Sequence, residues 1–446
     1  MIINLPAEVT KILEKFQDAH FEIYVVGGAV RDLLMGRKVD DWDFTTNATP
    51  LEIQKIFPES YYDNSFGTVG VAVENQNPYE ITTFRTEDSY SDKRRPDKVS
   101  WGKTLEEDLK RRDFTINAMA IDPSLRMIDL YKGKEDLKNK LIRAVGDPHE
   151  CFSEDALRMM RAIRIASELH FQIDEKTWDA IKDNSFLIDR ISRERVRDEL
   201  LKIVVAPYPD HGILLLKDSG LLRLILPELE KGFGVEQKSI KRHHIYDVGT
   251  HSVMSLKYCK SNDPITRFAT LIHDIGKPQT FKKLESGVIT FYNHEVVGAH
   301  IAKRIAERLR FSRKDSDKLY KLVRWHQFSV GEGQTDSAIR RFIRHVGLEN
   351  VSDMLDLRVA DRLGGGATET SWRLEEFKKR LVEVQKQPFS VHDLKIDGVD
   401  VMKELGIKPG PKVGEILNSL FKEVEEKKIE NERQVLLKQL SLLRHQ

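Results

Sequence analysis

Two aspartates separated by one residue, Asp41 and Asp43, carry the first chemical signal in this chain of 446 residues. Alternate residues of a strand point to the same face of a sheet, so we expect the two carboxylates to project together. Carboxylate oxygens are hard ligands of the kind that Mg²⁺ prefers, and metal ions held in this way can stabilise a phosphoryl displacement. The pair therefore predicts a catalytic Mg²⁺ site.

A glycine pair, Gly27-Gly28, precedes these aspartates at the end of a strand predicted over residues 21–27. A short helix predicted over residues 29–35 follows, and its N-terminus can bind phosphate groups through backbone N–H groups. Arg31 lies just inside that helix and can reach the same phosphates. A lone glycine pair usually marks a turn and a lone Asp-x-Asp usually marks solvated surface, but their combination in this order predicts a triphosphate site.

A row of charged residues follows at helical spacing. Asp155, Arg158 and Arg161 are spaced by three residues, so they are expected on one helix face, and Arg164 continues the row. Asp–Arg pairs that stabilise the helix would explain a single such pair, but three arginines need more than one carboxylate. Arg112, in the segment RRDFTINA, precedes this row and follows a charged helix.

Histidines and aspartates form a third pattern between residues 243 and 361. A single histidine is more often a core residue than a ligand, but the order His…His-Asp…Asp favours a metal site. Such a mixed nitrogen and oxygen set suits Mn, Fe, Co, Ni or Zn. The candidate ligands are His251, His273, Asp274 and Asp361, with His294, His300 and His326 in the same region.

The pattern of apolar residues places these candidates on two kinds of structure. Residues 67–74 and 79–85 are rich in β-branched residues, and we predict that they form a hairpin with a turn at 75–78. From Ser153 onward the periodicity is helical, with breaks near residues 207–209, 231–234, 262–264, 364–366 and 409–411. The fold class predicted is α+β, with a small head of mixed sheet and helices followed by an all-α remainder.

Composition limits the choice of partners and compartment. The chain has 72 basic and 71 acidic residues, so a nucleic acid would have to bind a local basic surface. Its two cysteines, Cys151 and Cys259, are far apart and are expected to be buried thiols in a reducing cytosol. No apolar run approaches the ~20 residues of a membrane span, so a cytoplasmic location without a membrane partner is expected.

The order of motifs carries a resemblance. A strand ending in Gly-Gly, a short spacer and Asp-x-Asp resemble the DNA polymerase β-type nucleotidyltransferase superfamily. The segments GGAVRD, DWDF, FGTVGV, ITTFR, RRDFTINA and EDALRMMR occur in this order over about residues 24–200. They resemble the class II tRNA nucleotidyltransferases, the CCA-adding enzymes, and this resemblance implies tRNA, CTP and ATP as partners and no DNA.

The resemblance also implies roles for single residues. The tRNA 3′-hydroxyl would attack the α-phosphate of CTP or ATP beside Mg²⁺ held by Asp41 and Asp43, and Glu80 is the candidate third carboxylate. Asp155 and Arg158 would read the Watson–Crick edge of the base, because a carboxylate accepts from the amine that C and A share. The triphosphate and ribose would be held by Gly28, Arg31, Arg112, Arg161 and Arg164, with less specific roles for Arg111, Asp113 and Asn117.

The phrase LIHDIGK, residues 271–277, resembles the HD phosphohydrolase superfamily. This implies a second, hydrolytic centre with His251, His273, Asp274 and Asp361 as metal ligands, and with His294 and His326 as ligands of a dinuclear form. The predicted domains are a head (1–147), a helical neck and body (148–235), an HD domain (236–370) and a helical tail (371–446).

Four alternatives stay open at the level of sequence. A poly(A) polymerase shares the head motifs, but usually carries a strongly basic extension that this near-neutral chain lacks. An enzyme adding only CC or only A has the same motifs, although residues 86–102 resemble the flexible loop tied to the final A. A protein-modifying nucleotidyltransferase with an HD domain and a non-catalytic RNA-binding protein are the other two.

Overall fold

The computed structural model describes residues 4–63, 67–72, 78–87, 99–101, 104–237, 245–328, 335–384, 391–426 and 428–443. The chain divides into two compact units. The first consists of residues 1–235 with 262–264 and 304–312, and the second consists of the remainder. Each unit is described by itself.

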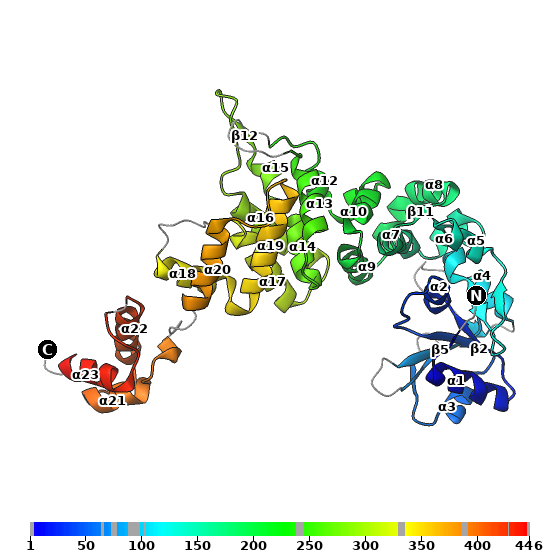
Figure 1. Ribbon diagram of the computed structural model, residues 1–446, viewed down its shortest axis with the longest axis horizontal. Helices are drawn as coiled ribbons and strands as arrows, with labels where there is room; N and C mark the ends of the chain where they lie inside the picture. Colours follow the sequence, from blue (N-terminus) through cyan, green and yellow to red (C-terminus); the bar gives the residue numbers. More distant parts are fainter. Residues whose placement is uncertain are drawn as a thin grey trace. The chain divides into compact units, whose positions relative to one another are not determined.

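A seven-stranded sheet forms the N-terminal part of the first unit, in the order β3-β4-β5-β2-β1-β8-β9. Figure 1 labels β2 and β5 of this sheet. All neighbours are antiparallel except β2 and β5, which run parallel. The strands are β1 (Ile23–Val26), β2 (Asp43–Thr46), β3 (Tyr61–Asp63), β4 (Thr68–Val71), β5 (Tyr79–Thr83), β8 (Met119–Ile121) and β9 (Met127–Asp129).

Alternation along the strands gives the sheet two different faces. Val25, Phe44 and Ile81 point into a large core covered by α1 (Ala7–Asp18), α2 (Gly28–Leu34) and α3 (Pro50–Ile56). Val26 lies in a smaller core on the other face, against Leu105 and Leu109 of α4 (Leu105–Lys110). Because the side-chain period is two, Asp43 and Glu80 point away from the larger core.

The hairpin predicted from residues 67–85 is confirmed, because β4 and β5 pair antiparallel. Of its turn, residues 75–77 lie outside the described part of the chain. The prediction of a loop over residues 86–102 is wrong at both ends, where β6 (Arg85–Glu87) pairs with β7 (Val99–Trp101). Residues 88–98, most of that segment, are not described.

Helices follow the sheet as predicted. The first unit continues with α5 (Gly133–Lys138), α6 (Pro148–Glu154), α7 (Leu157–Leu169), α8 (Glu175–Asn184), α9 (Arg193–Val205), α10 (Pro209–Asp218), α11 (Leu221–Ile225) and α12 (Pro227–Glu230). One short parallel pair, β10 (Leu141–Ile142) with β11 (Gln172–Ile173), interrupts them. Helix α7 packs against α9 and α10. Asp155 does not belong to α7, which corrects the expectation that it shares a helix with the arginines.

The second unit is helical apart from the short pair β12 (Lys282–Lys283) and β13 (Ile289–Thr290). Helix α13 (Val248–Tyr258) packs along α19 (Val351–Gly364), and these two lie near each other in Figure 1. A separate core joins the last three helices around Val401, Leu420 and Leu436. The remaining helices are α14 (Pro264–Ile272), α15 (Lys277–Thr280), α16 (His294–Arg308), α17 (Arg313–Trp325), α18 (Asp336–Val346), α20 (Trp372–Val384), α21 (Gly398–Leu405), α22 (Pro411–Glu425) and α23 (Arg433–Leu443).

Two predictions about the whole chain can be compared with the structure. Cys151 and Cys259 are free and buried, as expected. Within the described residues, every helix is too short or too polar to span a membrane.

Candidate active site and metal centre

A cavity of about 600 Å³ opens in the first unit beside strands β2 and β5. Carboxylates and arginines dominate its wall, so it suits a ligand that carries negative charge together with a cation. From the sequence-based candidates it gathers Gly28, Asp43, Glu80, Arg112, Asp155, Arg158 and Arg161. Asp41, Arg31 and Arg164 are not among the residues that line it.

Asp43 and Glu80 are register partners on the parallel strands β2 and β5. Both line the cavity, so two carboxylates lie side by side on one face of the sheet. Asp41 is exposed and lies two residues before β2, not within it. The pKa of Asp43 is raised to about 6, mainly by burial. The positive charge of Arg112 lowers this pKa, and the negative charges of Glu80 and Asp41 raise it further. This concentration of negative charge is the environment that a divalent cation would neutralise.

Gly27 brings the backbone close to these carboxylates. Its φ of +74° is a conformation that residues with a side chain rarely adopt. A β-carbon at this position would lie 3.2 Å from Asp43 Oδ2 and 3.2 Å from Arg112 Nη1. The turn before α2 therefore passes directly beside the carboxylate and the guanidinium, and only glycine leaves room for it.

Asp108 of α4 positions two arginines of the cavity wall. Its carboxylate is fully buried and accepts from Arg111 Nη2 at 2.5 Å and from Arg112 Nη2 at 3.1 Å. Burial alone would raise the pKa of Asp108, but Arg112 and Arg111 outweigh burial and lower it. Sequence analysis missed Asp108, although its spacing of three and four residues from the arginines was a usable signal.

A second network joins α7 to the segment after α4. Arg161 Nε donates to Asp113 Oδ2 at 2.8 Å, and Asn117 Nδ2 donates to Asp113 Oδ1 at 3.2 Å. Asn117 Oδ1 in turn accepts from Arg31 Nη1 at 2.9 Å. Burial would raise the pKa of Asp113, but Arg161 outweighs it and lowers that pKa to about 2. Asp113 is therefore a permanent anion that orients Arg161.

Asp155 and Arg158 lie together at the wall of the cavity. Asp155 Oδ1 accepts from the backbone N–H of Leu157 at 3.0 Å, and its Oδ2 accepts from Arg195 Nη2 at 2.7 Å. Arg158 donates to the carbonyl oxygens of Cys151 at 3.2 Å and Arg111 at 2.9 Å, and it pairs with Glu154. Backbone contacts thus fix both side chains before any ligand arrives.

Arg31 and Arg164 have other partners. Arg31 is buried and donates to both carboxylate oxygens of Asp32, at 3.1 and 3.0 Å. Arg164 pairs with the buried Glu199 and with Glu168. Neither lines the cavity, so the structure assigns them contacts within the protein.

Two further arginines of the cavity wall escaped sequence analysis. Arg195 comes from α9, and Arg85, the first residue of β6, donates to Thr68 Oγ1 at 2.9 Å. Arg195 lies in the segment RISRERVRDEL, residues 190–200, where the sequence patterns predicted no site residue. Only the packing of α9 against α7 reveals that this arginine reaches Asp155.

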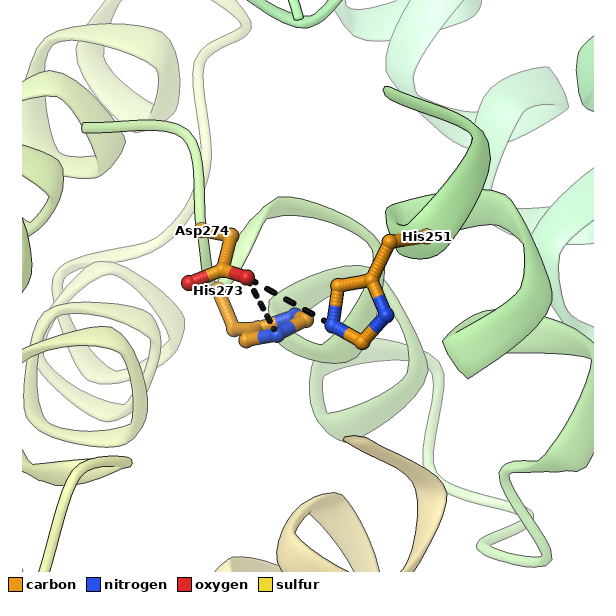
Figure 2. Close-up of side chains that lie close together, drawn as sticks. All are labelled: His251, His273 and Asp274. Atoms are coloured by element: carbon orange, nitrogen blue, oxygen red, sulfur yellow. Dashed lines mark ion pairs between the residues drawn. The ribbon is translucent and has the colours of Figure 1, made fainter. Parts of the chain in front are cut away.

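A second polar cluster surrounds Asp274 in the second unit. Asp274 Oδ2 lies 3.5 Å from His251 Nε2 and 3.2 Å from His273 Nε2, and Figure 2 shows both imidazoles turned toward this carboxylate. The other oxygen, Oδ1, lies 3.3 Å from His294 Nε2 and 3.6 Å from His326 Nε2. Each oxygen therefore faces its own histidine pair, and Oδ2 also lies 2.6 Å from Lys277 Nζ. His273 and Asp274 follow α14 in a turn, which corrects the expectation of a helix.

The backbone orients three of these histidines in the same way. The Nδ1 atoms of His273, His294 and His326 each lie 2.7 Å from the carbonyl oxygen three residues earlier. A protonated Nδ1 leaves the lone pair of Nε2 free, and these three Nε2 atoms are buried without a hydrogen-bond partner. Buried donors and acceptors are nearly always satisfied, so the three lone pairs fit a metal ion.

Asp361 contributes a second carboxylate to the half of the cluster that contains His251 and His273. Its Oδ1 lies 3.2 Å from His251 Nε2 and 3.6 Å from His273 Nε2. Burial lowers the pKa of His273, but Asp274 and Asp361 outweigh burial and raise it to about 10, so the two carboxylates favour positive charge between them. His300 is exposed and faces Tyr320, with the two ring centres 6.2 Å apart; it lies outside the cluster.

Comparison with known proteins adds three matched family models. The poly(A) polymerase head domain matches residues 23–143, and the "Probable RNA and SrmB- binding site of polymerase A" matches residues 170–233. A tRNA nucleotidyltransferase domain 2 model matches residues 291–440. The sheet, its carboxylates and these matches together define a nucleotidyltransferase of the poly(A) polymerase head type. His251, His273 and Asp274 lie outside the matched ranges.

Full-length relatives define the family more narrowly. The chain is 35% identical over 442 residues to the CCA-adding enzyme of Ligilactobacillus salivarius, covering 98% of this chain and 97% of the relative. It is 34% identical to that of Pediococcus pentosaceus over 97% of this chain and 96% of the relative. The crystal structure of the Bacillus stearothermophilus CCA-adding enzyme in complex with CTP superposes with a TM-score of 0.74 at 28% identity, covering 98% of this chain and 97% of that chain.

The chain belongs to the CCA-adding enzymes. It is therefore a tRNA nucleotidyltransferase that acts at the 3′ end of tRNA, and membership of this family implies a divalent metal in the head. The α+β head followed by a largely helical remainder, predicted from the sequence, is confirmed.

Proposed function

We propose that the head completes tRNA ends from CTP and ATP, with Mg²⁺ held by Asp41, Asp43 and Glu80. The observation that carries this proposal is the pairing of Asp43 with Glu80 across parallel strands, at the wall of a cavity that also holds arginines. The effect of Asp41 on the pKa of Asp43 supports its place in the same carboxylate set. Bound metal would lower the pKa of the tRNA 3′-hydroxyl and neutralise developing charge.

The chain's own residues then position the reactants. The turn at Gly27 admits the triphosphate beside Asp43, and Arg112 and Arg161 are placed by Asp108 and Asp113 to bind its phosphates. The 3′-oxygen of the tRNA bonds to the α-phosphorus while the bond to the β-phosphate oxygen breaks, releasing pyrophosphate. Arg31 and Arg164 act by holding the neighbouring elements in place, since both are engaged by carboxylates of the protein.

Base choice is assigned to Asp155 and Arg158. C and A present an exocyclic amine at the edge where U and G present a carbonyl, so a carboxylate acceptor favours CTP and ATP. Arg195 holds Asp155 Oδ2 and thereby orients that acceptor. A carboxylate left facing a carbonyl would cost roughly 1–3 kcal/mol, which is enough to bias incorporation.

The decisive experiment incubates tRNA that lacks its CCA end with Mg²⁺ and each labelled nucleoside triphosphate in turn. We expect two CMP residues to be added first and one AMP only afterwards. Addition of AMP alone to many RNAs would identify a poly(A) polymerase, and addition that stops after CC would identify a partial enzyme.

For the second unit we propose a dinuclear metal centre that hydrolyses phosphate esters. Its support is the pair of histidine sets that share Asp274, each with ligand atoms within 4.8 Å of one another. His251, His273 and Asp361 would hold one ion, His294 and His326 the other, and Asp274 would bridge them. Two such ions can stabilise both the attacking and the leaving oxygen.

Metal analysis tests this second role directly. Protein dialysed against Mn²⁺, Ni²⁺, Co²⁺, Fe²⁺ or Zn²⁺ with excess Mg²⁺, which keeps the head site filled with Mg²⁺, should retain two transition-metal ions per chain, and it should cleave p-nitrophenyl phosphate with one of these metals. Retention of none would contradict the centre. The division into a head to 147, neck and body to 235, HD domain to 370 and tail to 446 remains a prediction, as does the cytoplasmic location.

A further inference from the structure

A second cavity, of about 490 Å³, lies in the second unit between the C-terminal half of α19 and the first turn of α20. That volume falls within the range of sites for small molecules. Its walls are Phe328, Arg358, Arg362, Ser371, Trp372, Arg373 and Leu374.

The charge of this cavity selects an anion. Three arginines line it, and its lining residues include no carboxylate. Arg362 donates to the carbonyl oxygens of Thr368 at 3.2 Å and Thr370 at 3.4 Å, so those bonds hold its guanidinium without neutralising it. Neither Arg362 nor Arg373 forms an ion pair within the described part of the chain. The N-terminal turn of α20 adds its partial positive charge.

Aromatic side chains supply the other half of the site. Trp372 is 58% exposed, which is unusual for so large an apolar side chain, and the Arg373 guanidinium lies 5.4 Å from its ring centre. Phe328, a second aromatic lining residue, is nearly buried and stacks on Phe377 at 5.1 Å, so this part of the wall is held in place. An exposed indole beside arginines is the arrangement that stacks a nucleobase while its phosphate is held.

Arg358 connects this cavity to the histidine cluster. Its Nη1 lies 3.1 Å from Asp361 Oδ2, and Asp361 Oδ1 lies 3.2 Å from His251 Nε2. A phosphate bound at Arg358 would therefore be linked to the cluster through the ion pair with Asp361. Because Arg358 and Asp361 are three residues apart on α19, one helix face serves both sites.

We propose that this cavity binds a nucleoside phosphate, with the base on Trp372 and the phosphate between Arg358 and Arg362. The inference rests on the hydrolytic role proposed for the second centre and names its substrate class. Hydrolysis of the bound ester consumes one water, breaks the P–O bond and yields a nucleoside hydroxyl and inorganic phosphate. The phosphate can belong to a free mononucleotide or to the terminal nucleotide of an RNA.

The test measures binding of AMP and CMP to the full-length protein by calorimetry, with adenosine and inorganic phosphate as partial ligands. The measurements use full-length protein that carries Arg112→Gln and Arg161→Gln, which removes two arginines of the head cavity, so the remaining signal reports the second unit. We expect Trp372→Ala and Arg362→Gln each to weaken mononucleotide binding at least tenfold. Trp372→Ala should leave phosphate binding unchanged. Lys379→Gln removes one positive charge from an exposed position of the same helix and serves as the control.

A short RNA with a terminal phosphate, compared with the same RNA without it, distinguishes the two sources of ligand. Mononucleotide binding or phosphate-dependent RNA binding that needs Trp372 supports the proposal. Binding of neither, or equal binding by Trp372→Ala and wild type, would overturn it. Binding that needs Trp372 in a protein that hydrolyses no ester would refute the hydrolytic role while leaving the nucleotide site intact.

Discussion

Arg161 and Asp113 form an ion pair that joins α7 to the segment after α4, with Arg161 Nη2 2.7 Å from Asp113 Oδ2. The carboxylate is buried, so the interaction is poorly screened by solvent. Arg161, which we assign to phosphate binding, is thus held by the Asp113 carboxylate, and the same ion pair joins α7 to the segment after α4.

This pair predicts a pH-dependent contribution to stability. Because the pKa of Asp113 in the folded state, about 2, lies below its ordinary value of 3.8, the charged carboxylate stabilises the fold above about pH 4. The contribution, roughly 2 kcal/mol, is lost as the pH falls through the folded pKa. Urea denaturation at pH 7 should show that loss in Asp113→Asn. Asp179→Asn, an exposed carboxylate, should change the free energy of unfolding by less than about 0.5 kcal/mol.

The carboxylate set predicts a sharp contrast between neighbouring aspartates. Asp43→Asn should lower CMP incorporation by a factor on the order of 10³, because the metal loses a ligand where charge develops. Asp40→Asn removes an exposed carboxylate whose partner is Lys38, and it should leave the rate within twofold. The rates come from single-turnover addition of labelled CMP, and equal losses in the two variants would contradict the assignment.

The lack of space beside Gly27 predicts that a single added methyl group weakens CTP binding. Gly27→Ala would place a carbon 3.2 Å from both Asp43 Oδ2 and Arg112 Nη1, so we expect the KM for CTP to rise at least tenfold. Gly36→Ala is the matched control, because Gly36 also has a positive φ of 66° but nothing within 4 Å of an added carbon. Both variants carry backbone strain, so a difference between them isolates crowding of the site.

Base selection provides a test of Arg195. Arg195→Gln frees Asp155 Oδ2, and the discrimination of CTP against UTP should fall about tenfold, equivalent to roughly 1.4 kcal/mol. Asp155→Ala should lose more discrimination while still binding the triphosphate. Arg193→Gln, whose partner is the exposed Asp189, should discriminate like the wild type. Unchanged selectivity in Asp155→Ala would refute the base-reading role.

The two halves of the histidine cluster can be separated by mutation. His326→Ala should reduce the bound Mn²⁺ from two ions per chain to one, measured by mass spectrometry after dialysis with excess Mg²⁺ to fill the head site, because His251, His273 and Asp361 are untouched. His300→Ala alters an exposed histidine outside the cluster and should retain two. If both variants bind as much metal as the wild type, His326 is no ligand.

Local sequence was enough to predict strands β1, β2, β4 and β5, the hairpin β4–β5 and the order of motifs, because alternation and turn residues act over short distances. It was also enough to name the six side chains of the histidine cluster, since histidines are few in this chain and the order His…His-Asp…Asp is specific. The partners of Arg31 and Arg164 were not predictable. Whether an arginine faces a ligand or a carboxylate of the protein depends on packing, as Glu199 of α9 shows by reaching Arg164 of α7.

Long-range contacts also explain the missed residues. Arg195 is forty positions from Asp155, and nothing in either local pattern indicates their contact at 2.7 Å. The pairing of Asp43 with Glu80 depends on strand order, which places β5 beside β2 although β3 and β4 intervene in the chain. Sequence could suggest Glu80 only through resemblance, whereas the sheet register gives it a physical reason.

The shared carboxylate of Asp274 has a consequence for how ions load. The Asp274 carboxylate lies between two histidine pairs, so the first bound cation would partly neutralise its negative charge. The attraction of the second cation would then be weaker. Successive affinities should therefore differ, and a titration should show two separate steps. Such a protein would hold one ion per cluster across a broad range of metal concentrations. The rate of its proposed hydrolysis would then depend on the concentration of free metal.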